Sequence, residues 1–80
     1  MHEKPIFYRV RTPLVASSQD KDGRARFVAI PRGSVLVVPR KLGHLGLVDV
    51  ECDGRRLSVF SRDIHERAEK IEDVKRAVQS

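Results

Sequence analysis

The stretch LVDVECDGRRLSVF, residues 47–60, decides the fold class of this chain. At its centre lies Asp53-Gly54, the dipeptide preferred in two-residue type I′ turns, and apolar and polar residues alternate on both sides of it. In the register that such a turn imposes, Val50 faces Leu57, so apolar side chains share one face of the hairpin. Polar pairs fall on the other face, and these are Glu51 with Arg56 and Asp49 with Ser58. A shift by one residue would mix the two faces, so the sequence predicts an antiparallel hairpin in this register.

Three further strands are expected before this hairpin. Residues 5–10 alternate, residues 26–30 are rich in apolar residues, and residues 35–38 form an unbroken apolar run that predicts burial on both faces. Pro13 interrupts the first strand, which we expect to lie at an edge or to continue through Leu14–Ala16. The polar stretch 17–23 is typical of a loop, and residues 30–33 of a β-turn.

A helical pattern follows the hairpin. Apolar residues recur at helical spacing from Ile64 to Val78, which predicts an amphipathic helix over residues 63–80. Ser61 is the expected N-cap, and three acid–base pairs stand four residues apart: Asp63–Arg67, Glu66–Lys70 and Glu72–Arg76. At this length the helix is marginal alone, so we expect it to pack on its own sheet or on a second chain.

Five short strands with no crossover helix close most naturally as a small antiparallel barrel. The glycine-led strand GSVLVV (residues 33–38) and the ending GLVDVECDGRRLSVFSRDI (residues 46–64) resemble the second half of an SH3-like barrel. In such domains a tight hairpin precedes a strand that runs into a short turn carrying an Asp-Leu or Asp-Ile pair, here Asp63-Ile64. The chain is also similar to small uncharacterised bacterial proteins with that ending. We therefore expect one domain that is mainly β: a five-stranded SH3-like barrel over residues 1–62 and a C-terminal helix over residues 63–80.

The resemblance does not extend to the familiar SH3-like binding surfaces. Proline-recognition grooves and aromatic cages are lined by several aromatic side chains. This chain has no tryptophan, one tyrosine and three phenylalanines, and some of these must fill the core. The resemblance thus implies a fold and leaves the ligand open.

Length and composition restrict the classes of protein to which the chain belongs. Eighty residues make one domain of marginal stability, so self-association is one way in which the chain could be stabilised. With Cys52 alone no internal disulfide can form, and the polar start lacks a signal-peptide core, so a cytoplasmic location is expected. The longest apolar run, residues 35–38, is far shorter than a membrane span.

The net charge of +5 is unevenly distributed. Acids and bases cancel after residue 60, so the whole basic excess lies before it. If the bases converge on one face, they form a patch that binds nucleic acid, and the alternative is a solvated basic surface that keeps the protein soluble. The residues predicted to bind nucleic acid are Arg9, Arg11, Arg24, Arg26, Arg32, Arg40 and Lys41.

No motif for catalysis or metal binding stands out. The three histidines and Cys52 are scattered without ligand spacing, and Cys52 falls on the apolar face of the hairpin, where it is expected to pack rather than react. Ser61, Asp63 and His65 are close in sequence but do not converge where a strand meets a helix. The loop 40–46, with two cations and two glycines, is the best single candidate for an anion contact.

We therefore expect a non-catalytic binding or regulatory module without cofactor, with nucleic acid as its first-choice partner. The alternative is a protein-interaction or structural domain that forms a homodimer through the helix or an edge strand. No membrane partner and no small-molecule substrate are expected.

Overall fold

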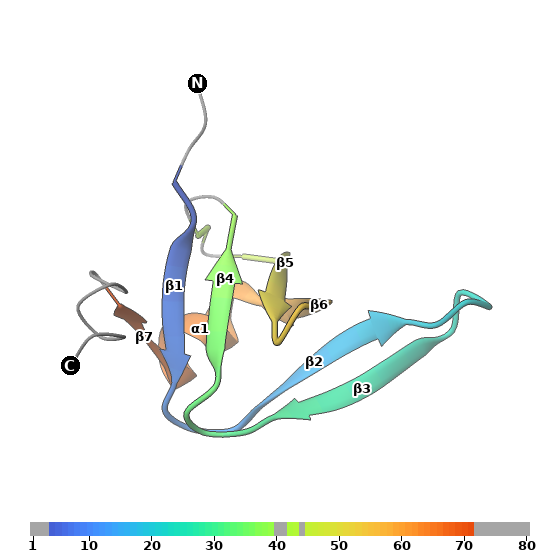
Figure 1. Ribbon diagram of the computed structural model, residues 1–80, viewed down its shortest axis with the longest axis horizontal. Coiled ribbons are helices and arrows are strands. Elements are labelled where there is room, and N and C mark those ends of the chain that lie inside the picture. The colour runs from blue at the N-terminus through green and yellow to red at the C-terminus, as the bar shows by residue number, and fades with distance from the viewer. Residues whose placement is uncertain (1–3, 40–41, 44, 72–80) are drawn as a thin grey trace.

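The computed structural model describes residues 4–39, 42–43 and 45–71, which form one antiparallel sheet of seven strands and one short helix. In chain order the elements are β1 (Ile6–Val10), β2 (Leu14–Gln19), β3 (Ala25–Ile30), β4 (Val35–Val38), β5 (Leu47–Cys52), β6 (Arg55–Phe60), α1 (Ser61–Arg67) and β7 (Ala68–Ile71). Their order across the sheet is β3-β2-β6-β5-β4-β1-β7 (Figure 1). The expectation of a mainly β domain is confirmed. The expectation of a closed five-stranded barrel is wrong, because the described sheet is open, with β3 and β7 at its edges.

The β5–β6 hairpin has the register that its alternating pattern predicts. Val50 pairs with Leu57 and Asp49 with Ser58. Asp53 and Gly54 have φ angles of 53° and 77°, as a type I′ turn requires. One face of the hairpin belongs to the core, and across the other the Ser58 hydroxyl donates to Asp49 Oδ1 over 2.9 Å.

The first part of the predicted loop 17–23 belongs to a strand. Ser17 to Gln19 belong to β2, which pairs with β3 over its whole length. A short turn at residues 20–24 suffices, because Asp20 Oδ1 accepts hydrogen bonds from the backbone N–H groups of Asp22 and Arg24, each at 2.9 Å. Polar side chains are compatible with this strand because its outer face is open to solvent. The β2–β3 hairpin stands away from the rest of the sheet (Figure 1).

The helix starts two residues earlier than predicted and ends at Arg67, so the prediction of continuous helix from residue 63 is wrong. Ala68 is extended, with φ −134° and ψ 159°, and β7 pairs with β1. This pairing satisfies the backbone groups that β7 directs to β1, and Ala68 is buried. The predicted pair Glu66–Lys70 therefore loses its helical spacing, and Arg62–Glu66 pairs instead at 3.1 Å. Residues 72–80, with the third predicted pair, lie outside the described part of the chain.

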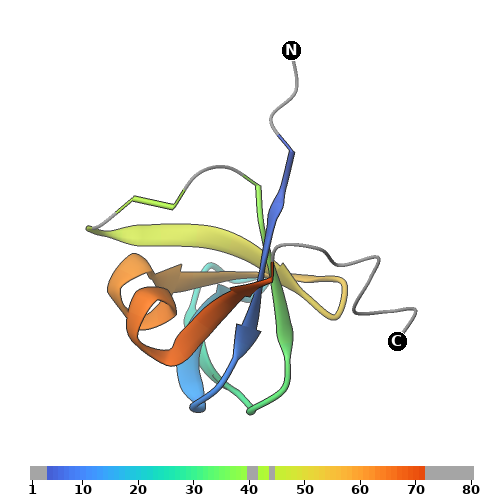
Figure 2. The same cartoon turned by 90° about the vertical axis from the view of Figure 1, so that its left-hand side faces the viewer.

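Ser61 does not cap the helix. The N-cap is Phe60, without a side-chain hydrogen bond, and Ser61 is buried with its N–H donating to the carbonyl of Gly46 over 2.9 Å. Figure 2 shows α1 beside the sheet, between the end of β6 and β7. Ile64 carries the helix into the core and is completely buried.

The core lies on the concave side of the sheet and draws on every strand. Its most deeply buried side chains are Ile30, Leu36, Ile64, Val10, Val38, Val50 and Val59. The expectation that residues 35–38 are buried on both faces is wrong, because Val35 is 38% exposed. The preceding turn is displaced by one residue from the predicted one. Ser34 N–H donates to the Pro31 carbonyl, and Gly33, with φ 94°, takes the third position, where a positive φ favours glycine.

Candidate functional site

The structure separates the basic residues that the sequence grouped together. Arg9, Arg11 and Arg32 lie where β1 ends and β4 begins, whereas Arg24 and Arg26 lie at the tip of the β2–β3 hairpin, which projects away from β1 (Figure 1). Arg40 and Lys41 lie outside the described residues. The five predicted residues that the structure describes therefore fall into two separate groups.

Three arginines gather at one end of the sheet, and we call Arg11, Arg32 and Arg67 the basic end. Val10 exchanges backbone hydrogen bonds with Gly33 and Ser34, both at 2.8 Å, which holds Arg11 beside the turn that carries Arg32. The N–H groups of Arg11 and Thr12 both donate to the Arg67 carbonyl, at 2.8 and 3.1 Å. Backbone hydrogen bonds thus hold the main chains of all three arginines close together.

The charges at the basic end are largely uncompensated by the described residues. Arg11 and Arg32 are exposed, and neither has an ion-pair partner within residues 4–39, 42–43 and 45–71. Arg67 donates to the Pro13 carbonyl over 3.2 Å, which orients its guanidinium while leaving its charge unpaired. Arg9 differs, because Glu69 lies opposite it on β7.

The hairpin tip is closer to neutral. Arg26 lies 3.9 Å from Asp20, whose other carboxylate oxygen holds the turn. Across the tip, three bases (Lys21, Arg24 and Arg26) are offset by two acids (Asp20 and Asp22). Arg24 and Arg26 thus form a weaker anion site than the basic end.

The loop that begins at residue 40 packs against α1 in its described part. Leu42 is buried, and the ring Nε2–H of His65 donates to the Gly43 carbonyl over 2.9 Å. The Gly46 carbonyl accepts from Ser61. These glycines present carbonyl oxygens to the helix rather than N–H groups to an anion, so the described part of the loop does not support an anion site.

Neither Ser61 nor Cys52 is placed for nucleophilic chemistry. Ser61 is buried and His65 turns to Gly43, so these two side chains do not act as a nucleophile–base pair. Burial raises the pKa of the Cys52 thiol, and the Asp53 carboxylate acts in the same direction. Cys52 is thus a packing residue that ionises with difficulty. In the described part of the chain no group of three or more His, Cys, Asp and Glu side chains could hold a metal ion.

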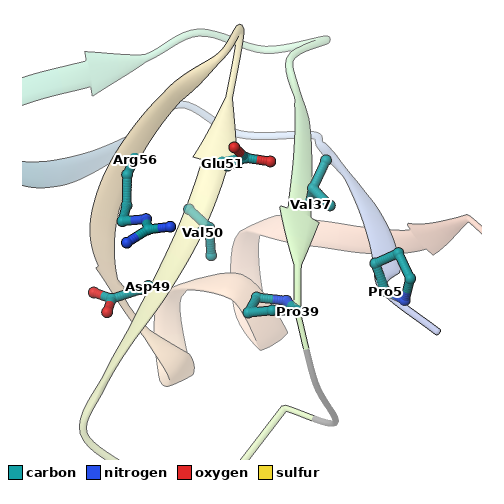
Figure 3. A pocket seen from close by; sticks show the side chains of 7 residues that line it. All are labelled: Pro5, Val37, Pro39, Asp49, Val50, Glu51 and Arg56. Atoms are coloured by element: carbon teal, nitrogen blue, oxygen red, sulfur yellow. The ribbon is translucent and has the colours of Figure 1, made fainter. Parts of the chain in front are cut away.

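The outer face of the sheet carries a hollow of about 470 Å³ between β4 and β5 (Figure 3). Its lining combines apolar and charged side chains: Pro5, Val37, Pro39, Asp49, Val50, Glu51 and Arg56. The two carboxylates on β5 outnumber the one guanidinium on β6, so a polyanion is a poor match for this hollow. A second hollow of about 390 Å³ adjoins it across Asp49 and Arg56 and reaches the β2–β3 hairpin.

Beside the second hollow, large apolar side chains are exposed across neighbouring strands. Leu47, 60% exposed, pairs with Phe60, 57% exposed, and Ser17 of β2 pairs with Ser58 of β6. Continuing that register by two residues places Val15 beside Phe60, and Val15 in turn pairs with Ala29. We call the row Leu47, Phe60, Val15 and Ala29 the outer stripe; Phe27, 79% exposed, lies next to it on β3.

Comparison with protein families, curated proteins and solved structures gave no match for this chain. None of the helices in the described residues has the length and apolar character needed to cross a membrane. The basic end and the outer stripe are the two features of the described residues that suggest a function.

Sequence reasoning missed the outer stripe, although part of its signal was present. Leu47 and Phe60 face each other in the predicted hairpin on the side opposite Val48 and Val59, which is the polar side. An apolar pair on a polar face is a sign of a contact surface. The other half of the stripe could not be found, because it depends on the pairing of β2 with β6 and β3, whereas residues 14–16 were expected to continue the first strand and residues 17–23 to form a loop.

Proposed function

We propose that the chain is a non-catalytic binding module that holds nucleic acid at its basic end. The observation that supports this proposal is the set of backbone hydrogen bonds that brings the main chains of three exposed residues, Arg11, Arg32 and Arg67, to one end of the sheet. Guanidinium groups bind phosphate oxygens in two-point contacts, and each neutralised phosphate releases counterions. The net charge of +5 adds long-range attraction.

The character of the site supports backbone contact rather than base reading. Among the described residues the aromatic side chains Phe27 and Phe60 lie on the outer face, and neither belongs to the basic end. Stacking of single-stranded bases therefore contributes little, and affinity should depend on salt far more than on sequence.

Fluorescence anisotropy with labelled DNA and RNA, single- and double-stranded, tests the proposal across a salt titration. For duplex DNA, the double variant Arg11→Gln/Arg32→Gln should weaken binding and reduce the slope of log K against log salt by about 2, since each lost phosphate contact removes about 0.9. Arg24→Gln/Arg26→Gln removes the same charge at the hairpin tip and should leave the slope nearly unchanged. Absence of binding at the lowest salt, or equal losses in the two variants, would end the proposal.

A second candidate function is protein binding through the outer stripe. Exposed apolar side chains on four adjacent strands, next to a hollow with Asp49 and Arg56 in its lining, have the composition of an interface core beside a polar rim. Phe60→Ser should abolish such binding without loss of the fold, because its side chain is more than half exposed.

We also propose that the fold is a variant of the SH3-like architecture. The support is the tight Asp53-Gly54 hairpin followed by a short helical turn that carries Asp63-Ile64, with Ile64 inserted in the core. The open sheet and the extra strands distinguish it from the closed five-stranded form.

A further inference from the structure

Within the described part of the chain, the edge strand β3 has backbone hydrogen-bonding groups that no other strand uses. Among the described strands β3 pairs with β2 alone. The N–H of Asp20 donates to the carbonyl of Arg24 over 3.0 Å, and hydrogen-bonded pairs alternate along an antiparallel ladder, so Arg26, Val28 and Ile30 direct their backbone groups to β2. The remaining three residues of β3, which are Ala25, Phe27 and Ala29, direct theirs to the free edge.

This edge has few of the devices that normally keep edge strands apart. Proline occurs only after the strand, at Pro31, and the one charged residue of β3, Arg26, lies 3.9 Å from Asp20 of its own hairpin. Its central residue is Phe27, whose side chain is 79% exposed. An apolar, unpaired edge of this kind is a template for another strand.

We propose that the other strand is β3 of a second copy, paired antiparallel about a two-fold axis at Phe27. The residues with free backbone groups read Ala, Phe, Ala and are symmetric about Phe27, so the same surface fits itself, as a two-fold interface requires. In this register Phe27 faces the partner's Phe27, and each Ala25 faces the partner's Ala29. Six backbone hydrogen bonds form, two at each of the three pairs.

The charges agree with this register. Arg26 faces the partner's Val28 and Arg24 faces the partner's Ile30, so no base lies opposite a base. Continuing the pairing places Asp22 of the hairpin tip opposite the partner's Arg32 and Lys21 opposite the partner's Gly33. An unrelated extended peptide could use the same hydrogen bonds, but the symmetry of the edge favours a second copy.

The inference deepens the second candidate function, because the outer stripe ends on β3 at Ala29 and would continue onto the partner's β3. It is independent of nucleic-acid binding. A Phe27→Asp variant that is monomeric, and whose nucleic-acid binding depends on salt as that of the unaltered chain does, would show that dimerisation and nucleic-acid binding are separate.

Sedimentation equilibrium tests the pairing. The apparent mass should rise from 9.1 kDa toward twice that value as the protein concentration approaches about 1 mM. Phe27→Asp should weaken association on the order of 100-fold, because it places two carboxylates on the axis. Leu45→Asp changes an even more exposed apolar residue outside β3 and should leave association unchanged. A monomer throughout, or an undiminished Phe27→Asp dimer, overturns the proposal.

Two further variants test the edge and the register. Ala29→Pro removes an N–H from the free edge while the β2 ladder keeps its donors, so it should weaken the dimer and spare the hairpin. In a Cys52→Ala background, Ala25→Cys mixed with Ala29→Cys should form a disulfide-linked dimer, since hydrogen-bonded partners lie about 5.5 Å apart between Cα atoms. Neither cysteine variant alone should cross-link, and cross-linking of Ala25→Cys with itself contradicts the register.

Discussion

The two hairpins of this protein are built from the same backbone pattern but differ in what their side chains do. In β5–β6 one face is core: Val50, Leu57 and Val59 are all at most 3% exposed. In β2–β3 only the half nearest the sheet is buried, through Leu14, Ala16 and Ile30, and the other half projects into solvent. Side-chain burial fixes the register of the first hairpin. The second depends on backbone pairing and on the Asp20 turn over its outer half.

This difference implies unequal stability within one sheet. A hairpin without a buried face is marginal in water, so the outer half of β2–β3 should open without the rest of the domain. The basic end is held by β1, α1 and the turn before β4, and it lies on the more stable side of this division. The proposed dimer edge lies on the less stable side, where pairing with a second copy would contribute most.

The largest expected contrast comes from truncating one large apolar side chain in each hairpin. Leu57→Ala removes a buried side chain and should lower the free energy of unfolding by about 2–5 kcal/mol. Phe27→Ala removes a larger but exposed side chain and should change it by less than about 0.5 kcal/mol. Urea unfolding of the dilute monomer measures both changes in the free energy of unfolding. A Leu57→Ala chain that is already unfolded without urea would also agree with the large loss expected for this variant. Similar losses in the two variants would mean that both hairpins are packed alike.

A smaller effect should follow from Asp20→Ala, because the carboxylate accepts two backbone hydrogen bonds at the β2–β3 tip. The expected cost is about 1 kcal/mol, confined to this hairpin. Amide hydrogen exchange should accelerate at Arg26 and Val28 while the β5–β6 amides keep their protection. Asp22→Ala is the matched control, since its carboxylate holds neither of these bonds. Uniform acceleration over the whole sheet would show that the two hairpins open together.

The smallest expected effect concerns thiol ionisation. Because the pKa of Cys52 is raised in the folded state, its contribution to stability is complete below the ordinary thiol pKa and is lost as pH rises through the folded value. The stability difference between the unaltered chain and Cys52→Ala should therefore shrink as the pH rises above the ordinary thiol pKa.

A second measurement compares the two hairpins directly. In the variant Phe27→Cys, the new thiol at position 27 should react rapidly with an alkylating reagent, and the Cys52 thiol should react slowly. Equal rates would show that Cys52 is accessible.

Prediction from sequence succeeded where burial and turn chemistry both act within a few residues. The β5–β6 hairpin met this condition, since alternation and Asp53-Gly54 select one register. It failed at residues 68–71, which are a strand because they pair with the distant β1, and at residues 17–19, whose consecutive polar side chains show no apolar alternation although they pair with the neighbouring β3. Helical spacing from Ile64 to Ala68 is real, yet pairing with β1 overrides it after Arg67.

The sequence predicted that the candidate site consists of arginines, but it did not predict where in the fold they lie. Arg11 and Arg32 were identified from the charge excess, and whether they converge depends on the contacts of Val10 with Gly33 and Ser34. Arg67 could not be identified, because it was expected on the face of a long helix whose charges cancel. Arg67 belongs to the basic end because α1 ends at this residue, where its carbonyl accepts hydrogen bonds from Arg11 and Thr12 after β1.

The pairing of β1 with β7 also affects how the chain can fold during synthesis. Phe7 lies opposite Ile71, so the first strand finds one of its two neighbours only when almost the whole described chain has left the ribosome. Until then one edge of β1 is unpaired, and the long loop that must close makes this the slow, non-local step of folding. Nascent chains stalled before β7 should therefore be the species most exposed to aggregation and to chaperones.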